Sequence, residues 1–285
     1  MQSPYDQRIF LYTASTGTFK DLSALNIWNS EAPPIDFNML VGDYIYIASF
    51  LPFNHKFFQF GTPDTTPRKP IIEVLNGPAD WNQVVNQIDL TDGLKQSGVL
   101  GWVPDKDRGW ALISRSKTEI PIFQPIATAP EIYDSYWMRI SFDSPNAFTL
   151  KHVGQKFSSD ADLYQEYPNL KAVSILNSWK VGKTTWDDQA LTAASYISKA
   201  LISKNIIFSN NQILDIAVYR SASVHKTANI IYSGLGIRNY AEEVKLTEQR
   251  FKDAMNQGYY HPDQNANGRR DRFEATLVTS GRASR

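Results

Sequence analysis

The sequence predicts an α+β protein, with an antiparallel β-sandwich or jelly-roll domain in residues 1–156 and a helical domain in residues 157–285. Up to about residue 155, short apolar segments alternate with turn residues, and prolines recur every few residues between 33 and 145. No helical domain tolerates that spacing of prolines. Between residues 185 and 257, apolar residues instead recur at helical spacing. The length of 285 residues and the 42% apolar content suit two domains with separate cores.

Five segments of the first domain are predicted to be β-strands, because their apolar and aromatic residues alternate or run together between turn signals. In the last segment, positions 136, 138, 140 and 142 form an apolar face and positions 137, 139 and 141 form the opposite face. Short strands separated by Pro, Gly and Asn turns are typical of a sandwich. The predicted strands are 8–13, 43–48, 70–75, 99–103 and 136–142.

The second domain is predicted to begin with a short helix at 158–164, which ends where Tyr167 and Pro168 interrupt the pattern. Three longer helices follow, each opened by its own cap. Ser209 and Gln212 have the spacing of a capping box, and glycines at 234, 236 and 258 stand where C-terminal caps are expected. The longer helices are expected from Thr185 to about 201, from Ser209 to about 232, and from Asn239 to 257.

The composition excludes several functional classes. The formal net charge is zero, so bulk charge gives no argument for nucleic-acid binding. The chain has no cysteine, which removes disulfides, zinc fingers and thiol catalysis. No apolar run resembles a signal peptide or reaches the length of about 18 residues needed to span a bilayer. These features predict a soluble protein of a reducing compartment with no membrane contact.

The sharpest local motif is a calcium-loop pattern, D-x-[DN]-x-[DN]-G-x5-E, which the segment 263–274 fits at every specified position. Oxygen atoms from this loop would surround one cation, and Gly268 would supply the sharp turn. Three arginines offset the carboxylates, and Pro262 separates the loop from the preceding helix. The segment is therefore expected to hold a weak structural calcium ion, or to be an ordinary Asn/Gly-rich turn. The candidate ligands are Asp263, Asn265, Asn267, Arg269 (through its carbonyl), Asp271 and Glu274.

Residues 177–184 match all but one position of a phosphate-binding P-loop, with Asn177 in place of the first glycine. Without that glycine, the tight turn around phosphates is difficult to form. No alternating strand and helix pattern surrounds the segment either. A helix-entry turn capped by Thr184 or Thr185 is the preferred interpretation, and a nucleotide-processing enzyme is the weakest of the functional alternatives.

No catalytic grouping is evident elsewhere, and the chain is not expected to be an enzyme. The histidines at 55, 152, 225 and 261 have no metal-ligand spacing. Four tryptophans of the β region could form a sugar-stacking platform, although aromatic residues in strands more often serve as core. They are Trp81, Trp102, Trp110 and Trp137.

The C-terminal segment is rich in arginine and is predicted to bind a partner. Residues 269–285 hold five arginines against Asp271 and Glu274, and residues 275–285 have little apolar content with which to fold alone. Such an arm is expected to become ordered only on a partner surface. The candidate partner-binding residues are Arg269, Arg270, Arg272, Arg282 and Arg285.

Three stretches of the helical half resemble the head-to-tail connector adaptors of tailed bacteriophages. They are 162–170 (DLYQEYPNL), 193–197 (AASYI) and 251–254 (FKDA), and the resemblance covers about residues 157–258. The strands at 43–49, 76–81, 98–104 and 136–140 are similar to β-sandwich modules of phage virion and tail proteins. This chain differs from the usual adaptor by its long β domain in front and its calcium-like loop behind.

The resemblance implies a virion structural protein that forms a homo-oligomeric ring, expected to be a dodecamer, between portal and tail. Its partners would be the portal protein and a tail or stopper protein, and its lumen would pass DNA without reading sequence. Its location would be the neck of the virion, and the host cytoplasm during assembly. The main alternative is a tail or host-recognition module that binds surface carbohydrate through the β-sandwich.

Overall fold

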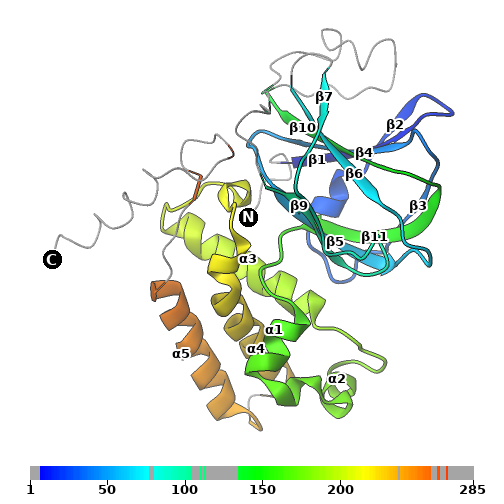
Figure 1. Cartoon of the computed structure of the whole chain (residues 1–285). Coiled ribbons are helices and arrows are strands. Elements are labelled where there is room, and N and C mark those ends of the chain that lie inside the picture. The colour runs from blue at the N-terminus through cyan, green and yellow to red at the C-terminus, as the bar shows by residue number, and fades with distance from the viewer. Residues whose placement is uncertain are drawn as a thin grey trace. The chain divides into compact units, whose positions relative to one another are not determined.

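The computed structural model describes residues 7–76, 80–103, 110, 112, 134–236, 238–257, 262, 263 and 268. Two antiparallel sheets pack as a β-sandwich over residues 7–154, and a region with five α-helices follows (Figure 1). The α+β fold class predicted from the sequence is confirmed. The chain forms two compact units, and the β-sandwich gives way to the helical unit between Gly154 and Gln155.

The first sheet has six strands in the order β2-β1-β4-β10-β6-β7, all antiparallel. Four of them were predicted, each within one residue of its bounds, because their apolar and aromatic residues lie between clear turn signals. Strands β2 and β7 are short and were not predicted. The bounds are β1 Gln7–Thr13, β2 Thr18–Asp21, β4 Tyr44–Ser49, β6 Pro70–Leu75, β7 Trp81–Gln83 and β10 Tyr136–Phe142.

The second sheet has five antiparallel strands in the order β3-β11-β5-β9-β8. Only β9 was predicted from the sequence. Strand β11 contains register shifts at Thr149/Leu150 and Leu150/His152, so its side chains do not alternate simply between faces. The bounds are β3 Ile35–Met39, β5 His55–Thr62, β8 Gln87–Asp89, β9 Gly98–Trp102 and β11 Asn146–Gly154.

One hydrophobic core fills the space between the two sheets. Strand β4 contributes Ile45 and Ile47, and β10 contributes Met138, Ile140 and Phe142. Because successive side chains of a strand point to opposite faces, Trp137 falls on the outer side of β10, in a separate cluster. The predicted division of β10 into two faces is therefore confirmed.

The described residues of the helical unit form five α-helices and three short 3-10 helices. Its helices form two buried clusters, one around Ile197 and Leu201 and one around Trp186 and Ile231. None of the helices in the described part of the chain combines the length and apolar character that crossing a bilayer requires. The bounds are α1 Asp160–Glu166, η3 Pro168–Lys171, α2 Val173–Trp179, α3 Asp187–Ser203, η4 Asn210–Gln212, η5 Ile216–Tyr219, α4 Arg220–Gly236 and α5 Ala241–Gln257.

The short helix expected at 158–164 is α1, and a capping box opens it. The Ser159 hydroxyl accepts a hydrogen bond from the Asp162 N–H, while the Asp162 carboxylate accepts from the Ser159 N–H. The chain then turns at Tyr167 into the 3-10 helix η3, where Pro168 takes the first position. The interruption predicted at Tyr167 and Pro168 is confirmed.

The prediction of one continuous helix from Ser209 to Tyr232 is wrong. The capping box of Ser209 and Gln212 exists, but it opens only the single turn η4, after which Ile213 is extended. The Gln212 carbonyl, which a continuing helix would use, instead accepts the Asp263 N–H at 2.9 Å, and the Gln212 side-chain amide donates to the Asp263 carbonyl at 2.8 Å. A second turn, η5, is then capped by Asp215, and α4 begins at Arg220.

The first long helix, α3, begins two residues after the predicted Thr185. Its N-cap is Trp186, whose side chain makes no capping bond. The Trp186 N–H instead donates to both carboxylate oxygens of Asp160, at 3.1 and 3.2 Å. Its indole N–H donates to the Leu170 carbonyl at 3.0 Å. These bonds, and not a Thr185 cap, position the start of α3.

The two glycines near the end of α4 have different roles. Gly236, the last residue of the helix, has a φ of 116°, which suits glycine at a helix terminus. Gly234 lies inside the last turn, where a Cβ atom would come 2.0 Å from the Trp179 ring. Gly234 therefore allows close packing between α4 and Trp179 rather than ending the helix.

Candidate functional site

Most of the predicted calcium loop lies outside the described residues. This holds for Asn265, Asn267, Arg269, Asp271 and Glu274, and for the candidate partner-binding residues Arg270, Arg272, Arg282 and Arg285. Asp263 is described and buried, and its backbone N–H donates to the Gln212 carbonyl at 2.9 Å. Gly268 has a φ of 73°, the left-handed conformation expected of a turn glycine. Within the described part of the chain, no group of three or more His, Asp or Glu side chains could hold a metal ion.

The P-loop-like segment forms a turn between two helices. A P-loop follows a β-strand, whereas this segment begins in the last turn of α2. The Asn177 side-chain oxygen accepts the Gly182 N–H at 3.1 Å, so this amide is engaged by the residue that replaces the first glycine. The helix-entry interpretation agrees with this geometry, although neither Thr184 nor Thr185 is the cap of α3.

The three histidines in the described part of the chain lie on three different elements. His55 on β5 and His152 on β11 are buried in the β-sandwich unit. Burial and then the Lys56 charge lower the pKa of His55 to about 3, and burial lowers the pKa of His152 to about 4. In the helical unit, His225 Nδ1 lies 2.8 Å from the Tyr167 hydroxyl. His261 lies outside the described residues.

The four tryptophans do not form one platform. Trp102 and Trp110 pack with the core between the sheets, and their ring centroids lie 5.5 Å apart. Trp81 and Trp137 belong to a different cluster, on the outer side of the six-stranded sheet. The interpretation of all four as a sugar-stacking surface is therefore wrong, because the sheet separates them into two pairs.

The outer side of the six-stranded sheet carries a layer of aromatic side chains, which we call the outer aromatic face. Strand pairing places Tyr12 of β1 between Phe19 of β2 and Tyr44 of β4. The Tyr12 ring centroid lies 4.9 Å from that of Phe19 and 6.3 Å from that of Tyr44. The members of the face are Phe10, Tyr12, Phe19, Tyr44, Tyr46, Trp81 and Trp137.

An ion pair lies in the middle of the outer aromatic face. Strand pairing places Arg139 of β10 between Tyr46 of β4 and Glu73 of β6. Arg139 Nε donates to Glu73 Oε2 at 2.6 Å. The guanidinium carbon also lies 4.4 Å from the Tyr44 ring centroid and 4.5 Å from that of Trp81. Two aromatic rings and a carboxylate thus hold this side chain in one orientation.

The surroundings of the ion pair shift two pKa values. Burial opposes the Arg139 charge, but the hydrogen bond and charge of Glu73 outweigh it and raise the pKa of the guanidinium. Burial raises the pKa of Tyr46 to about 12, against the opposing charge of Arg139. At neutral pH the Tyr46 phenol is therefore uncharged, and the charges of Arg139 and Glu73 cancel each other.

The sequence analysis named Trp81 and Trp137 as candidate binding residues. It did not predict that Arg139, Glu73 and Tyr44 lie beside them. The alternation of aromatic residues along β4 and β10 is visible in the sequence, and it indicates that both faces of each strand are covered. Which residues stand opposite each other depends on the pairing of strands that are far apart in the chain.

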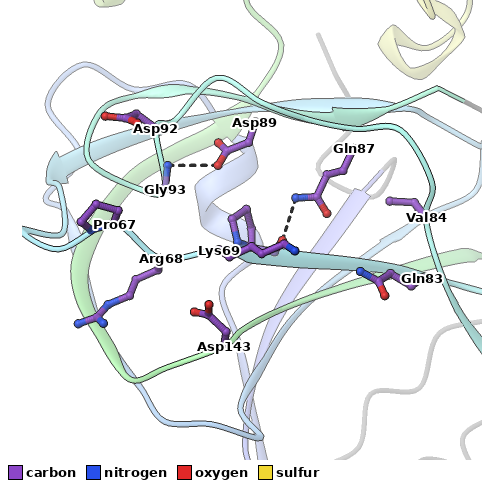
Figure 2. Close-up of a pocket in the computed structure, with 11 residues that line it drawn as sticks. Pro67, Arg68, Lys69, Gln83, Val84, Gln87, Asp89, Asp92, Gly93 and Asp143 are labelled. Carbon is purple, nitrogen blue, oxygen red and sulfur yellow. Dashed lines mark hydrogen bonds between the residues drawn. The ribbon is translucent and has the colours of Figure 1, made fainter.

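A separate cavity of about 590 Å³ opens beside the β7–β8 and β8–β9 connections (Figure 2). Its polar groups mostly hold local turns. The Asp89 carboxylate accepts the N–H groups of Thr91 and Gly93, at 2.8 and 3.1 Å. Gln87 donates to the Pro70 carbonyl at 2.8 Å. The lining residues are Pro67, Arg68, Lys69, Pro70, Gln83, Val84, Gln87, Asp89, Asp92, Gly93 and Asp143.

A group of charged residues lies where α1 and α3 begin. The Lys156 ammonium forms an ion pair with Asp187 at the first position of α3. Asp160, at the first position of α1, accepts the Trp186 N–H. Burial and then the Asp187 charge raise the pKa of Asp160, although Lys156 opposes the shift. This group joins two helix starts and is structural in character.

We expect the variant Asp160→Asn to gain stability relative to the wild type as the pH rises from 4 to 7. Because the folded-state pKa of Asp160 lies above its unfolded value, stability from this group is greatest below the unfolded value and is lost as the pH rises through the folded value. Urea unfolding followed by helical circular dichroism measures the free energy difference at each pH. Asp253→Asn, which replaces an exposed carboxylate of α5, is the matched control. A difference that stays constant or shrinks with rising pH would contradict the assignment.

Comparison with known proteins identifies no relative from which a function could be transferred: no family model and no curated protein matches the sequence.

Proposed function

We propose that this chain is a structural protein of a tailed-bacteriophage virion, a head-to-tail adaptor that forms a ring between portal and tail. In this role it carries out no reaction, and DNA passes through the lumen of the ring without sequence-specific contacts. The partners are the portal protein on one side and a tail or stopper protein on the other. The ring is expected to be a closed homo-oligomer, a dodecamer by resemblance to connector adaptors.

The observation that carries this proposal is where the resembling residues lie. Leu163, Tyr167 and Leu170 of the first stretch are buried in one cluster of the helical unit, together with Trp186. The second and third stretches contribute to the other cluster of the same unit, through Ala194, Ile197, Phe251 and Ala254. The stretches that resemble adaptors are thus the packing positions of a single helical unit.

The surface of the helical unit supports a role in assembly. Several large apolar side chains are exposed on its helices and turns. Their contact with water is unfavourable in an isolated subunit, and burying them at a subunit interface would stabilise an assembly. Val181, between α2 and α3, is 89% exposed, and Phe208, after α3, is 59% exposed. Val173, Tyr196 and Leu246 are also exposed.

The direct test is to locate the chain in the virion. Antibody labelling of the particle in electron micrographs is expected to place the chain at the junction of head and tail. The purified chain mixed with portal protein is expected to form a closed ring, detected by native mass spectrometry. Label at the tail tip or on the capsid surface would overturn the proposal, as would a chain that stays monomeric and does not bind portal.

A deletion of residues 275–285 provides the matched variant for the portal-binding experiment. The shortened chain is expected to unfold at the same urea concentration as the full chain but to dock on portal more weakly. Because arginine contacts with carboxylates or phosphates are electrostatic, the loss is expected to be greatest at low salt. If the two chains dock equally well, the C-terminal arm does not bind portal. The ring experiment would still test the adaptor role.

A further inference from the structure

We propose that the outer aromatic face of the six-stranded sheet binds a neutral glycan. This inference uses only residues of the β-sandwich unit and does not depend on the adaptor role. A failure of glycan binding would leave the ring and portal experiments untouched, and a failure of those experiments would leave the glycan experiment untouched.

Partly exposed aromatic rings extend across the outer aromatic face. Tyr12, Phe19, Tyr44 and Trp81 are each partly exposed, and they come from four different strands of one sheet. Neighbouring strands lie about 4.8 Å apart, which is close to the length of one sugar ring. Aromatic side chains present an apolar ring face, and Tyr12 and Tyr44 each add a hydroxyl group, which suits the mixed apolar and hydroxyl surface of a sugar.

A fixed hydrogen-bonding pair lies at the centre of the face. The side chains of Arg139 and Glu73 remain 15% and 18% exposed. The bond between them uses one of the five guanidinium N–H groups and one of the carboxylate oxygens, and Arg139 also bonds with Tyr46. The remaining N–H groups and the second carboxylate oxygen have capacity for further bonds. Because Tyr44 and Trp81 hold the guanidinium between them, a ligand would meet donors that are already oriented.

The balanced charges of the face favour a neutral ligand. The Arg139 charge is balanced by Glu73, and at the edge of the face Arg8 forms an ion pair with Asp21. Neither pair leaves an unbalanced cation to attract a phosphate or an acidic polysaccharide. Nucleic acid and acidic glycans gain most of their affinity from such cations, so the balanced charges select against them.

The burial pattern also favours a glycan over a protein partner. Protein interfaces depend on large apolar anchors that enter deep pockets. In this face the largest anchors are already packed, because Phe10, Tyr46 and Trp137 are 4%, 3% and 0% exposed. The surface therefore consists of partly exposed rings around a polar pair. Such a surface suits sugar rings that stack on the aromatic rings and sugar hydroxyls that bond to the pair, and it offers no deep pocket for a side chain of a protein partner.

The experiment uses the full chain and a panel of defined oligosaccharides. Neutral tetrasaccharides built from glucose, galactose, rhamnose or N-acetylglucosamine are the probes, and oligogalacturonate is the acidic comparison. Binding is screened on a glycan array and measured by isothermal titration calorimetry. At least one neutral oligosaccharide is expected to bind, and to bind more tightly than the acidic probe.

Substitutions then assign the binding to the face. Trp81→Ala is expected to weaken binding by about tenfold or more, equivalent to about 1.4 kcal/mol. Tyr12→Ala, at the other side of the face, provides an independent test if the first variant does not fold. Trp28→Ala is the matched control, because Trp28 is a half-buried aromatic residue of the same unit that packs against His152 and is not part of the face.

Glu73→Gln separates the polar contribution from stacking. It keeps the size of the side chain but removes its charge, and it is expected to weaken glycan binding while introducing binding of the acidic probe. Three results would each overturn the proposal: no neutral oligosaccharide binds the folded wild type, the acidic probe binds more tightly, or Trp28→Ala weakens binding as much as the variants of the face do.

Discussion

Replacing Trp186 by alanine is expected to lower the free energy of unfolding of the helical unit by about 3–5 kcal/mol. The Trp186 side chain is 0% exposed and packs in the cluster that joins α1, α2 and α4. Its ring meets Trp179 edge to face at 5.8 Å, and its indole N–H donates to the Leu170 carbonyl at 3.0 Å. The substitution would leave a cavity and a buried carbonyl without its donor, so both losses add.

Urea unfolding of the full chain, followed by helical circular dichroism, measures this loss. Tyr196→Ala removes an aromatic residue from α3 that is 51% exposed, and it is expected to cost less than about 1 kcal/mol. Trp186→Phe is expected to lie between the two, because it keeps most of the packing but loses the bond to Leu170. If Trp186→Ala costs no more than Tyr196→Ala, Trp186 does not hold the helical unit together.

A strand of this fold is predicted most clearly from the sequence where its apolar and polar residues alternate regularly. Strand β10 meets this condition, since its alternation is regular over seven residues and both of its faces were assigned correctly. Strand β5 does not, because its first six residues, from His55 to Phe60, are all buried and include a histidine and a lysine. Burial on both faces removes the alternation that identifies a half-exposed strand.

In the helical half, the capping box of Ser209 and Gln212 also shows that a local pattern predicts only part of the structure. A Ser and a Gln three residues apart predict that a turn begins at Ser209, and it does. The sequence near Ser209 does not set the length of that turn, because the Gln212 carbonyl accepts the N–H of Asp263, 51 residues away in sequence, instead of a helical N–H. The outer aromatic face is a stronger case, since Arg139 and Glu73 meet only through the pairing of β10 with β6.

The second large effect is expected at Lys56, a lysine inside the sandwich unit. It shares its side of β5 with Phe58 and Phe60, which belong to the core between the sheets. Lys56 is 2% exposed, and its ammonium lies 4.3 Å from the Phe53 ring centroid. Burial lowers the pKa of this lysine to about 7, because the charged form loses its water.

The lowered pKa makes the sandwich more stable in mild alkali. With a folded-state pKa near 7 and an unfolded value of 10.5, the folded state gives up this proton first, so stability rises as the pH increases between these values. The gain between pH 7 and pH 9 is expected to be about 2 kcal/mol. His55 and His152 do not contribute in this range, because their pKa values of about 3 and about 4 leave both uncharged.

Lys56→Met is expected to lose the rise in stability between pH 7 and pH 9, because methionine has no proton to give up in this range. Urea unfolding followed by tryptophan fluorescence measures the effect, since the sandwich contains Trp102 and Trp137 in buried positions. Helical circular dichroism of the same samples identifies the part of the signal that comes from Trp179 and Trp186 of the helical unit. Lys151→Met, on strand β11, replaces a partly exposed lysine and is the matched control, expected to leave the pH response as it is in the wild type. An unchanged pH response in the Lys56→Met variant would show that another group titrates between pH 7 and pH 9.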